Sequence, residues 1–401
     1  MQTNLPAQLL ASDAGQRAND ILRSCVHCGF CNATCPTYQL TGDELDGPRG
    51  RIYLIRELLE TGENTERATF HLDRCLTCRA CETTCPSGVS YGELAEIARN
   101  TLGTERAGLQ GWLRSFLQWL IPDAKRLRRM ARLGKLFRFV VPQNLAKNLP
   151  PSVGKPFRSS KHATATDAST VVLLNGCVQQ VSTSQTNQAL AALLQDRGIN
   201  VIAAPDEGCC GSLDLHLGDE SKALDRIRHN VDVLHALSNS AQAIVSTASG
   251  CGVTFKDYGR LLAHDPAYAQ QAAAVAAKVM DVSEYLAGLD VSWQKAKALD
   301  KVAWHSPCTL QHGQKSEGVV EQLLAQAGYE LTTVPDSHLC CGSAGTYSVL
   351  QPDMSEQLKA NKWAALLSDG PDIVATANVG CQTHLASAND LDVVHWVELL
   401  K

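Results

Sequence analysis

The sequence lacks several features that would place it in common functional classes. No stretch approaches 18 consecutive apolar residues, so we expect no transmembrane helix. The opening segment, MQTNLPAQLLASDAGQRAND, is polar throughout, so we expect no secretory signal and a cytoplasmic chain, attached at most to a membrane face. Neither a GxGxxG nor a P-loop motif is present, which leaves no recognisable flavin or nucleotide site. The net charge of -5 disfavours general nucleic-acid binding.

Cysteine, by contrast, is abundant. The chain has 16 cysteines in 401 residues, and without an export signal they indicate metal or cluster binding, because disulfide frameworks are typical of small secreted domains. Eight of them form two CxxCxxCxxxCP runs, namely Cys25, Cys28, Cys31 and Cys35 before Pro36, and Cys75, Cys78, Cys81 and Cys85 before Pro86.

This spacing is that of two-cluster ferredoxins, in which the fourth cysteine of each run binds the other cluster. It predicts two [4Fe-4S] clusters with crossed ligands. The first set is Cys25, Cys28, Cys31 and Cys85, and the second is Cys75, Cys78, Cys81 and Cys35.

The segment between the two runs has the apolar spacing of a helix. Ile52, Ile55, Leu58 and Leu59 recur at helical intervals, and Gly62 ends the segment. A helical lead-in over residues 1–24 and a helix over about 92–102 flank the runs. We therefore expect a mainly helical domain rather than the hairpin strands of a compact ferredoxin. Arg49 and Arg51 either hold this spacer against the anionic clusters or lie solvated on the surface.

A basic, aromatic stretch follows over residues 111–150. It contains nine Lys or Arg and one acid, Asp123, with Trp and Phe between them. Such a helical hairpin either lies in a membrane interface or packs on the cluster domain or a partner subunit. Residues 150–169, rich in Pro, Ser, Thr and Ala, are typical of an interdomain linker.

The remaining eight cysteines reveal an internal repeat. Each set consists of one cysteine, then a CCGS pair, then one cysteine: Cys177, Cys209, Cys210 and Cys251, and Cys308, Cys340, Cys341 and Cys381. The first cysteine precedes the pair by 32 residues in both sets, and the last follows it by 41 and 40. We infer a duplicated domain.

Each of these cysteines follows an apolar, β-type run such as VVLLN or DIVATAN, and helical segments lie between the runs. Alternating strands and helices predict a parallel sheet, and ligands collect at the carboxyl ends of its strands. All eight cysteines belong to those ends. The first copy has an extra helical stretch, about 257–278.

Four thiolates in each repeat suit a cubane cluster or a tetrahedral zinc ion, and buried structural cysteine is the alternative. The copies differ in histidine. His305 and His312 flank Cys308 where the first copy has Leu174 and Val181, and His384 follows Cys381. These histidines, with His338 beside the pair, make the second repeat the better candidate for a metal or proton-coupled site, or else they cap strand ends.

From Ser24 to the C-terminus the chain resembles the iron–sulfur subunits of bacterial glycolate oxidase, whose relatives include the C subunit of anaerobic glycerol-3-phosphate dehydrogenase and the B-type subunit of heterodisulfide reductase. The segments GPRGRIYLIRELLETG and LLNGCVQ favour the glycolate oxidase type. In the heterodisulfide reductase pattern a CCG domain closes with CxxC. Here Thr254 and His384 stand in place of that fifth cysteine, which argues against heterodisulfide chemistry.

The resemblance implies an α+β multidomain fold: an α-helical two-cluster ferredoxin domain (1–105), the basic hairpin and linker (106–168), and two α/β parallel-sheet CCG repeats (169–290 and 291–401). It implies an electron-transfer subunit, without catalytic residues, of a hetero-oligomeric glycolate oxidase. A flavin-containing subunit would oxidise glycolate to glyoxylate, and this chain would pass electrons toward a quinone-linked acceptor at the cytoplasmic face of the inner membrane. Alternatives are the corresponding subunit of a glycerol-3-phosphate or lactate dehydrogenase, a thiol or disulfide reductase, or a zinc-dependent assembly subunit.

Overall fold

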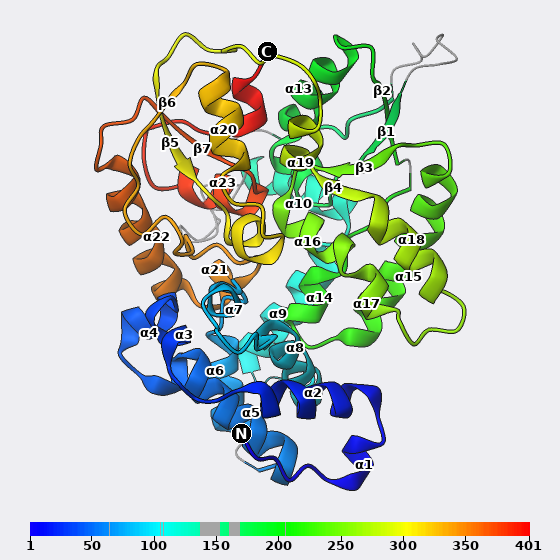
Figure 1. Cartoon of the computed structure of the whole chain (residues 1–401), viewed down its shortest axis with the longest axis vertical. Coiled ribbons are helices and arrows are strands. Elements are labelled where there is room, and N and C mark those ends of the chain that lie inside the picture. The colour runs from blue at the N-terminus through cyan, green and yellow to red at the C-terminus, as the bar shows by residue number, and fades with distance from the viewer. Residues whose placement is uncertain (64, 105, 107, 137–152, 160–168, 205) are drawn as a thin grey trace.

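The structure is a computed structural model that describes residues 1–401 except 64, 105, 107, 137–152, 160–168 and 205. A helical N-terminal part, blue to cyan in Figure 1, lies against two α/β units that stand side by side. This arrangement confirms the predicted fold class, a helical ferredoxin region followed by a duplicated parallel-sheet domain.

The described residues of the N-terminal part form helices and no strand. The helical elements are α1 (Ala7–Leu10), α2 (Asp13–Ser24), α3 (Phe30–Ala33), α4 (Pro36–Thr41), η1 (Glu44–Asp46), α5 (Pro48–Thr61), α6 (Thr65–Asp73), α7 (Ala80–Thr83), α8 (Tyr91–Leu102), α9 (Gly108–Leu120) and α10 (Ala124–Leu136). The spacer is α5, which begins at Pro48 and is capped after Thr61 by left-handed Gly62, as its sequence predicts.

The apolar faces of α2, α5, α6 and α8 form the core of this part. Leu22, Ile55, Leu72 and Leu94 are wholly buried in it. Burial of such a side chain contributes roughly 1.5–3 kcal/mol. The same cluster includes Cys25, so this core directly supports the first cysteine loop.

The remainder contains two four-stranded parallel sheets. The first repeat consists of β1 (Thr170–Leu173), α12 (Gln179–Ser182), α13 (Ser184–Gln195), β2 (Asn200–Ala203), α14 (Ser212–His216), α15 (Glu220–Ser238), β3 (Ala243–Ser246), α16 (Ser249–Lys256), α17 (Tyr258–Leu261), α18 (Ala269–Lys278), β4 (Val279–Asp281) and α19 (Val282–Ala287). The second consists of β5 (Lys301–His305), η2 (Thr309–Gly313), α20 (Val319–Gln326), β6 (Glu330–Leu331), α21 (Tyr347–Leu350), α22 (Pro352–Leu367), β7 (Ile373–Thr376), α23 (Val379–Ala386), β8 (Val393–His395) and η3 (Trp396–Leu399).

The strand orders are β2-β1-β3-β4 and β6-β5-β7-β8, so the two sheets have the same topology. Their central strands are buried on both faces, as expected for a parallel sheet covered by helices. The extra helical stretch of the first copy is α17 and α18. One apolar cluster contains residues of both repeats, among them Leu173 and Trp396, which joins the repeats into one body.

The helical part contacts the two repeats differently. It meets the first through polar pairs, such as Arg79 with Asp257 at 3.1 Å and Arg260 with Glu96 at 3.4 Å. It meets the second through an apolar cluster that includes Leu76 and Tyr347. The second repeat therefore shares a dry contact with the loop of the second cysteine run.

The basic stretch begins as the two helices α9 and α10, and its residues 137–150 lie outside the described part of the chain. Arg114 of α9 pairs with Asp73 at 2.6 Å, so one side of this helix packs internally. In the part of the chain that the structure describes, no helix has the length and apolar character needed to cross a membrane.

The glycine of each CCGS motif lets the cysteine pair lie directly on a helix. Gly211 has φ +92° and approaches α15, and Gly342 has φ +89° and approaches α22. A Cβ on Gly342 would lie 2.7 Å from the backbone oxygen of Ser355. A side chain at this position would be strained by the left-handed backbone conformation and would also clash with the carbonyl of Ser355.

We predict that Gly342→Ala lowers the free energy of unfolding by about 2–3 kcal/mol. The cost of the left-handed backbone adds to the cost of the contact between the new Cβ and the Ser355 carbonyl oxygen. Gly370 is the matched control, since it has φ +58° and open space around it. Gly370→Ala should cost only about 1 kcal/mol. Urea unfolding followed by circular dichroism measures both variants, and equal losses would contradict the close approach to Ser355.

Candidate metal centres

The structure groups the cysteines of the two runs around two hollows. The first encloses about 430 Å³, part of it open to solvent, and its cysteines include Cys25, Cys28, Cys31 and Cys85. The second measures about 360 Å³, also partly open to solvent, and its cysteines include Cys35, Cys75 and Cys78. Cys81, the remaining member, lines both hollows, as does Tyr91. The fourth cysteine of each run thus lies with the other run.

The chemistry of the first hollow fits a cationic iron–sulfur core. Burial raises the pKa of the Cys31 thiol to about 11 and also raises that of Cys25, so neither is a thiolate at neutral pH without a nearby positive charge. The loop that carries these cysteines turns at His27 and Gly29, which have φ +57° and +85°. Iron bound in this hollow would supply the charge that the thiolates require.

Two arginines stand beside the second hollow. Burial alone would raise the pKa of Cys75, but the guanidinium groups of Arg51 and Arg99 bring that pKa below its ordinary value. Arg51 is 1% exposed and donates to the His71 carbonyl at 2.8 Å. Arg99 donates to the Cys75 carbonyl, also at 2.8 Å. These fixed cations favour sulfur anions in this hollow.

Both spacer arginines line the hollows, Arg51 buried and Arg49 partly exposed to solvent. Arg49 lines the first hollow and pairs with Glu44 at 2.6 Å. Arg51 lines the second. Sequence reasoning missed Arg99, and it also missed Tyr91, whose hydroxyl lies 3.6 Å from the Cys75 sulfur. Tyr91 and Arg99 are eight residues apart on α8, which follows the second run, so they share one face of this helix. This spacing could have indicated from the sequence that both lie near the second cluster.

In the first repeat, the four cysteines gather in an apolar cluster on α15. The Cys177 thiol donates a hydrogen bond to the Cys209 sulfur, and this hydrogen bond together with burial raises the pKa of Cys177 well above its ordinary value. Asn230 donates to the Cys209 carbonyl at 2.9 Å and Tyr258 donates to that of Cys210 at 3.0 Å, which fixes the pair. Cys251 completes the group from the first turn of α16.

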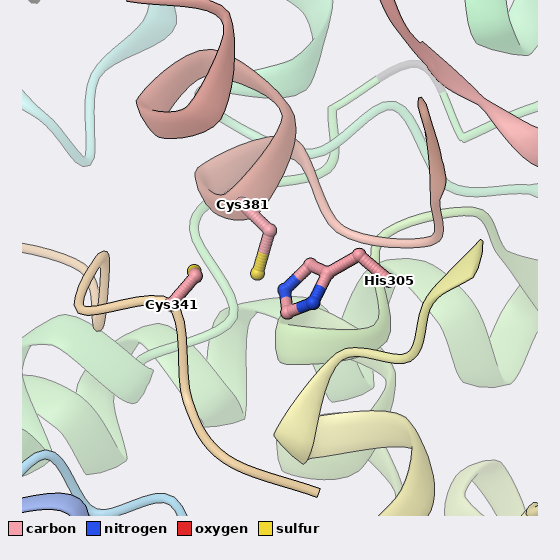
Figure 2. Close-up of side chains that lie close together, drawn as sticks. All are labelled: His305, Cys341 and Cys381. Atoms are coloured by element: carbon pink, nitrogen blue, oxygen red, sulfur yellow. The ribbon is translucent and has the colours of Figure 1, made fainter. Parts of the chain in front are cut away.

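In the second repeat, a histidine joins the cysteines. The Cys308 sulfur lies 4.0 Å from that of Cys340. Ligand atoms of His305, Cys341 and Cys381 all lie within 4.8 Å of one another, and the three side chains point toward one another (Figure 2). Burial lowers the pKa of His305 well below its ordinary value, so its imidazole is neutral.

The structure does not bring the other predicted histidines into this group. Both ring nitrogens of His312 have partners, Thr83 Oγ1 at 2.9 Å and the His338 carbonyl at 3.1 Å. His384 lies 3.3 Å from the hydroxyl of Ser355. His312 therefore links α7 of the helical part to the second repeat, and His338 contributes its backbone to that link.

Two cysteine-lined hollows beside two cysteine-rich parallel sheets define an iron–sulfur protein of the dicluster type. A model of the 4Fe-4S dicluster domain matches residues 21–89, and one of the cysteine-rich CCG domain matches residues 171–256 and 302–386. The dicluster domain has all eight cysteines of the two runs, so two [4Fe-4S] clusters are its cofactors.

Curated relatives identify the family. The glycolate oxidase iron-sulfur subunit of Escherichia coli K12 is 45% identical over 100% of this chain and 98% of its own length. The probable glycolate oxidase iron-sulfur subunit of Bacillus subtilis 168 is 31% identical over 90% of this chain and 87% of its own. A fumarate reductase (CoM/CoB) subunit of Methanothermobacter marburgensis is 25% identical over 94% of this chain and 72% of its own. The chain belongs to the glycolate oxidase iron-sulfur subunit family.

We predict that Arg99→Met lowers the reduction potential of the cluster next to Cys75 by roughly 60 mV, a tenfold change in the one-electron equilibrium. A nearby cation stabilises the reduced cluster more than the oxidised one, so its removal disfavours reduction. Arg99→Lys keeps the charge and should hold the potential close to that of the unmodified chain. Redox titration followed by electron paramagnetic resonance tests this, and an equal shift in both variants would show that charge is not the cause.

Proposed function

We propose that this chain is the electron-transfer subunit of a multi-subunit glycolate oxidase. It accepts electrons from a flavin-containing subunit that oxidises glycolate to glyoxylate, and it passes them toward a quinone-linked acceptor. The observation that carries this proposal is the adjacency of the two hollows, which share Cys81 and Tyr91 in their walls. Short steps between neighbouring centres are what an electron relay requires.

We assign the ligands as two crossed sets. Cys25, Cys28, Cys31 and Cys85 hold one [4Fe-4S] cluster, and Cys75, Cys78, Cys81 and Cys35 hold the other. When bound, the clusters supply reversible one-electron transfer. The chain's own part is to bury the sulfurs, to balance their charge with Arg51 and Arg99, and to keep the geometry fixed.

The second hollow lies beside the second repeat. Cys78 packs against the apolar cluster that contains Cys340, and Cys308 packs against the same cluster. The first repeat meets the helical part through partly buried ion pairs instead. The second repeat therefore forms the apolar surroundings of the second cluster, and the first repeat holds the helical part through ion pairs.

Substrate oxidation belongs to a partner chain, since this sequence has no GxGxxG or P-loop motif. A role in heterodisulfide reduction is disfavoured, because Thr254 and His384 replace the fifth cysteine of each repeat. Purification of the assembled complex and assay with glycolate, lactate and glycerol 3-phosphate tests the substrate. Activity with lactate or glycerol 3-phosphate in place of glycolate would assign the chain to a related dehydrogenase.

We predict that Cys28→Ser and Cys78→Ser each abolish electron delivery from the complex to an acceptor downstream of this chain, because each removes a cluster ligand. The crossed assignment makes a sharper prediction. Cys85→Ser should change the same paramagnetic resonance signal as Cys28→Ser, and Cys35→Ser the same signal as Cys78→Ser. If Cys85→Ser instead matches Cys78→Ser, each run serves its own cluster and the crossed assignment is wrong.

We also propose that α9 and α10 attach the chain to the cytoplasmic face of the inner membrane, where a quinone acceptor resides. Trp112 and Trp119 are 62% and 51% exposed. Leu133 and Leu136 on α10 are also exposed, and so are Arg129 and Arg132 beside them. Exposed tryptophan and leucine beside cations fit the headgroup region of an anionic bilayer.

The double variant Trp112→Ser/Trp119→Ser should bind vesicles containing anionic phospholipid roughly tenfold more weakly than the unmodified chain, since it loses apolar contact with the interface. Leu367→Ser is the matched control, because Leu367 is an exposed apolar residue of α22. Cosedimentation with vesicles measures both. Unchanged vesicle binding together with loss of a partner subunit would assign this surface to protein contact.

A further inference from the structure

Three elements of the second repeat converge on one point in its interior. His305 is the last residue of β5, Cys341 belongs to the CCGS loop, and Cys381 lies in the first turn of α23. The three residues are 2%, 1% and 4% exposed. One ligand atom from each lies within 4.8 Å of the other two, and Figure 2 shows the three residues around one point.

The imidazole of His305 has no partner for either ring nitrogen among the described residues. Leaving a buried polar group unpaired costs about 1–3 kcal/mol. His395 is a buried histidine that serves as a comparison, because both of its ring nitrogens have partners. It is 1% exposed, and its nitrogens meet the Thr247 carbonyl at 2.8 Å and the Val397 amide at 3.2 Å. His305 is buried to the same extent but faces two sulfurs.

The duplication provides an internal comparison. The first repeat keeps all four cysteines but has Leu174, 3% exposed, at the position of His305, three residues before the first cysteine. The cysteine framework therefore does not require a histidine there. The imidazole is a feature of the second repeat and needs its own explanation.

Two thiolates and one imidazole form a donor set that suits a single zinc ion. Zinc binds sulfur at about 2.3 Å and imidazole nitrogen at about 2.0–2.1 Å, so tetrahedral ligand atoms lie roughly 3.4–3.8 Å apart. The observed spread, within 4.8 Å, needs only a small inward movement of the side chains to reach that spacing. Cysteines that bind a cubane each occupy a different iron, which demands a wider arrangement.

We propose that the second repeat binds one zinc ion through His305, Cys341 and Cys381, with the fourth position open. Binding converts the two thiols to thiolates and releases two protons to solvent, which leaves the site without net charge. Three protein ligands and one open position are the pattern of zinc sites that hold a water or a substrate group. Cys308 and Cys340 lie beside this site, 4.0 Å apart, as neighbouring thiols.

The test uses the full chain, purified anaerobically with its clusters and stripped of loosely held metal. Zinc is added back and the bound zinc, iron and acid-labile sulfide per chain are measured. We expect one tightly bound zinc. His305→Leu, which installs the residue of the first repeat, should weaken zinc binding at least tenfold, and Cys381→Ser should do the same. His305→Cys restores a ligand and should retain the zinc.

Cys251→Ser is the matched control, because Cys251 is the counterpart of Cys381 in the first repeat; it should leave the zinc content unchanged. Two results would overturn the proposal: equal zinc affinity in His305→Leu, or loss of iron and sulfide instead of zinc in Cys381→Ser. If His305→Leu fails to fold, X-ray absorption of the zinc-loaded unmodified chain decides, since an all-sulfur shell excludes the imidazole. The iron content of the ferredoxin domain is read separately, so this proposal can fail while the electron-transfer proposal stands.

Discussion

A buried sulfur anion needs a positive charge beside it, and the arginines beside the second hollow serve that requirement. Transfer of a thiolate from water into an apolar interior is costly unless a metal or a cationic side chain compensates it. Around the second hollow Arg51 and Arg99 provide part of that charge, and burial leaves the pKa of Cys31 at the first hollow near 11 in its absence. Cluster binding and folding of the helical part are therefore coupled, because the core that holds α2, α5 and α8 also includes Cys25.

The duplicated domain shows how one framework can take two roles. Both copies have the same strand order, the same cysteine pair and a left-handed glycine pressed against the following helix. They differ at the ends of the strands, where Leu174 in one copy corresponds to His305 in the other. They differ also in their contact with the helical part, which includes ion pairs for the first copy and an apolar cluster for the second. The two copies therefore differ in the surface that contacts the helical part and in the residues beside the cysteines, while their sheets have the same topology.

The apolar contact bears on the electron transfer that we propose. It places the loop of the second cysteine run against the cysteines of the second repeat in a largely buried apolar cluster. A dry contact lowers the reorganisation that accompanies movement of charge, and His312 adds a polar link at the same interface through Thr83. The first repeat, held by ion pairs, instead fixes the orientation of the helical part.

The sequence by itself determined the local features. The CxxCxxCxxxCP runs indicated two clusters, the apolar spacing predicted α5, and equal cysteine intervals predicted two copies of a parallel-sheet domain. These three predictions succeeded because the spacing of residues along the chain directly determines the geometry of a loop or a helix. Only the tertiary structure decided that Arg51 and Arg99 meet at Cys75, and that His305 rather than His312 faces two sulfurs. Those contacts join elements 24 to 76 residues apart in the sequence, and their meeting depends on how the helices and sheets pack, which no local pattern records.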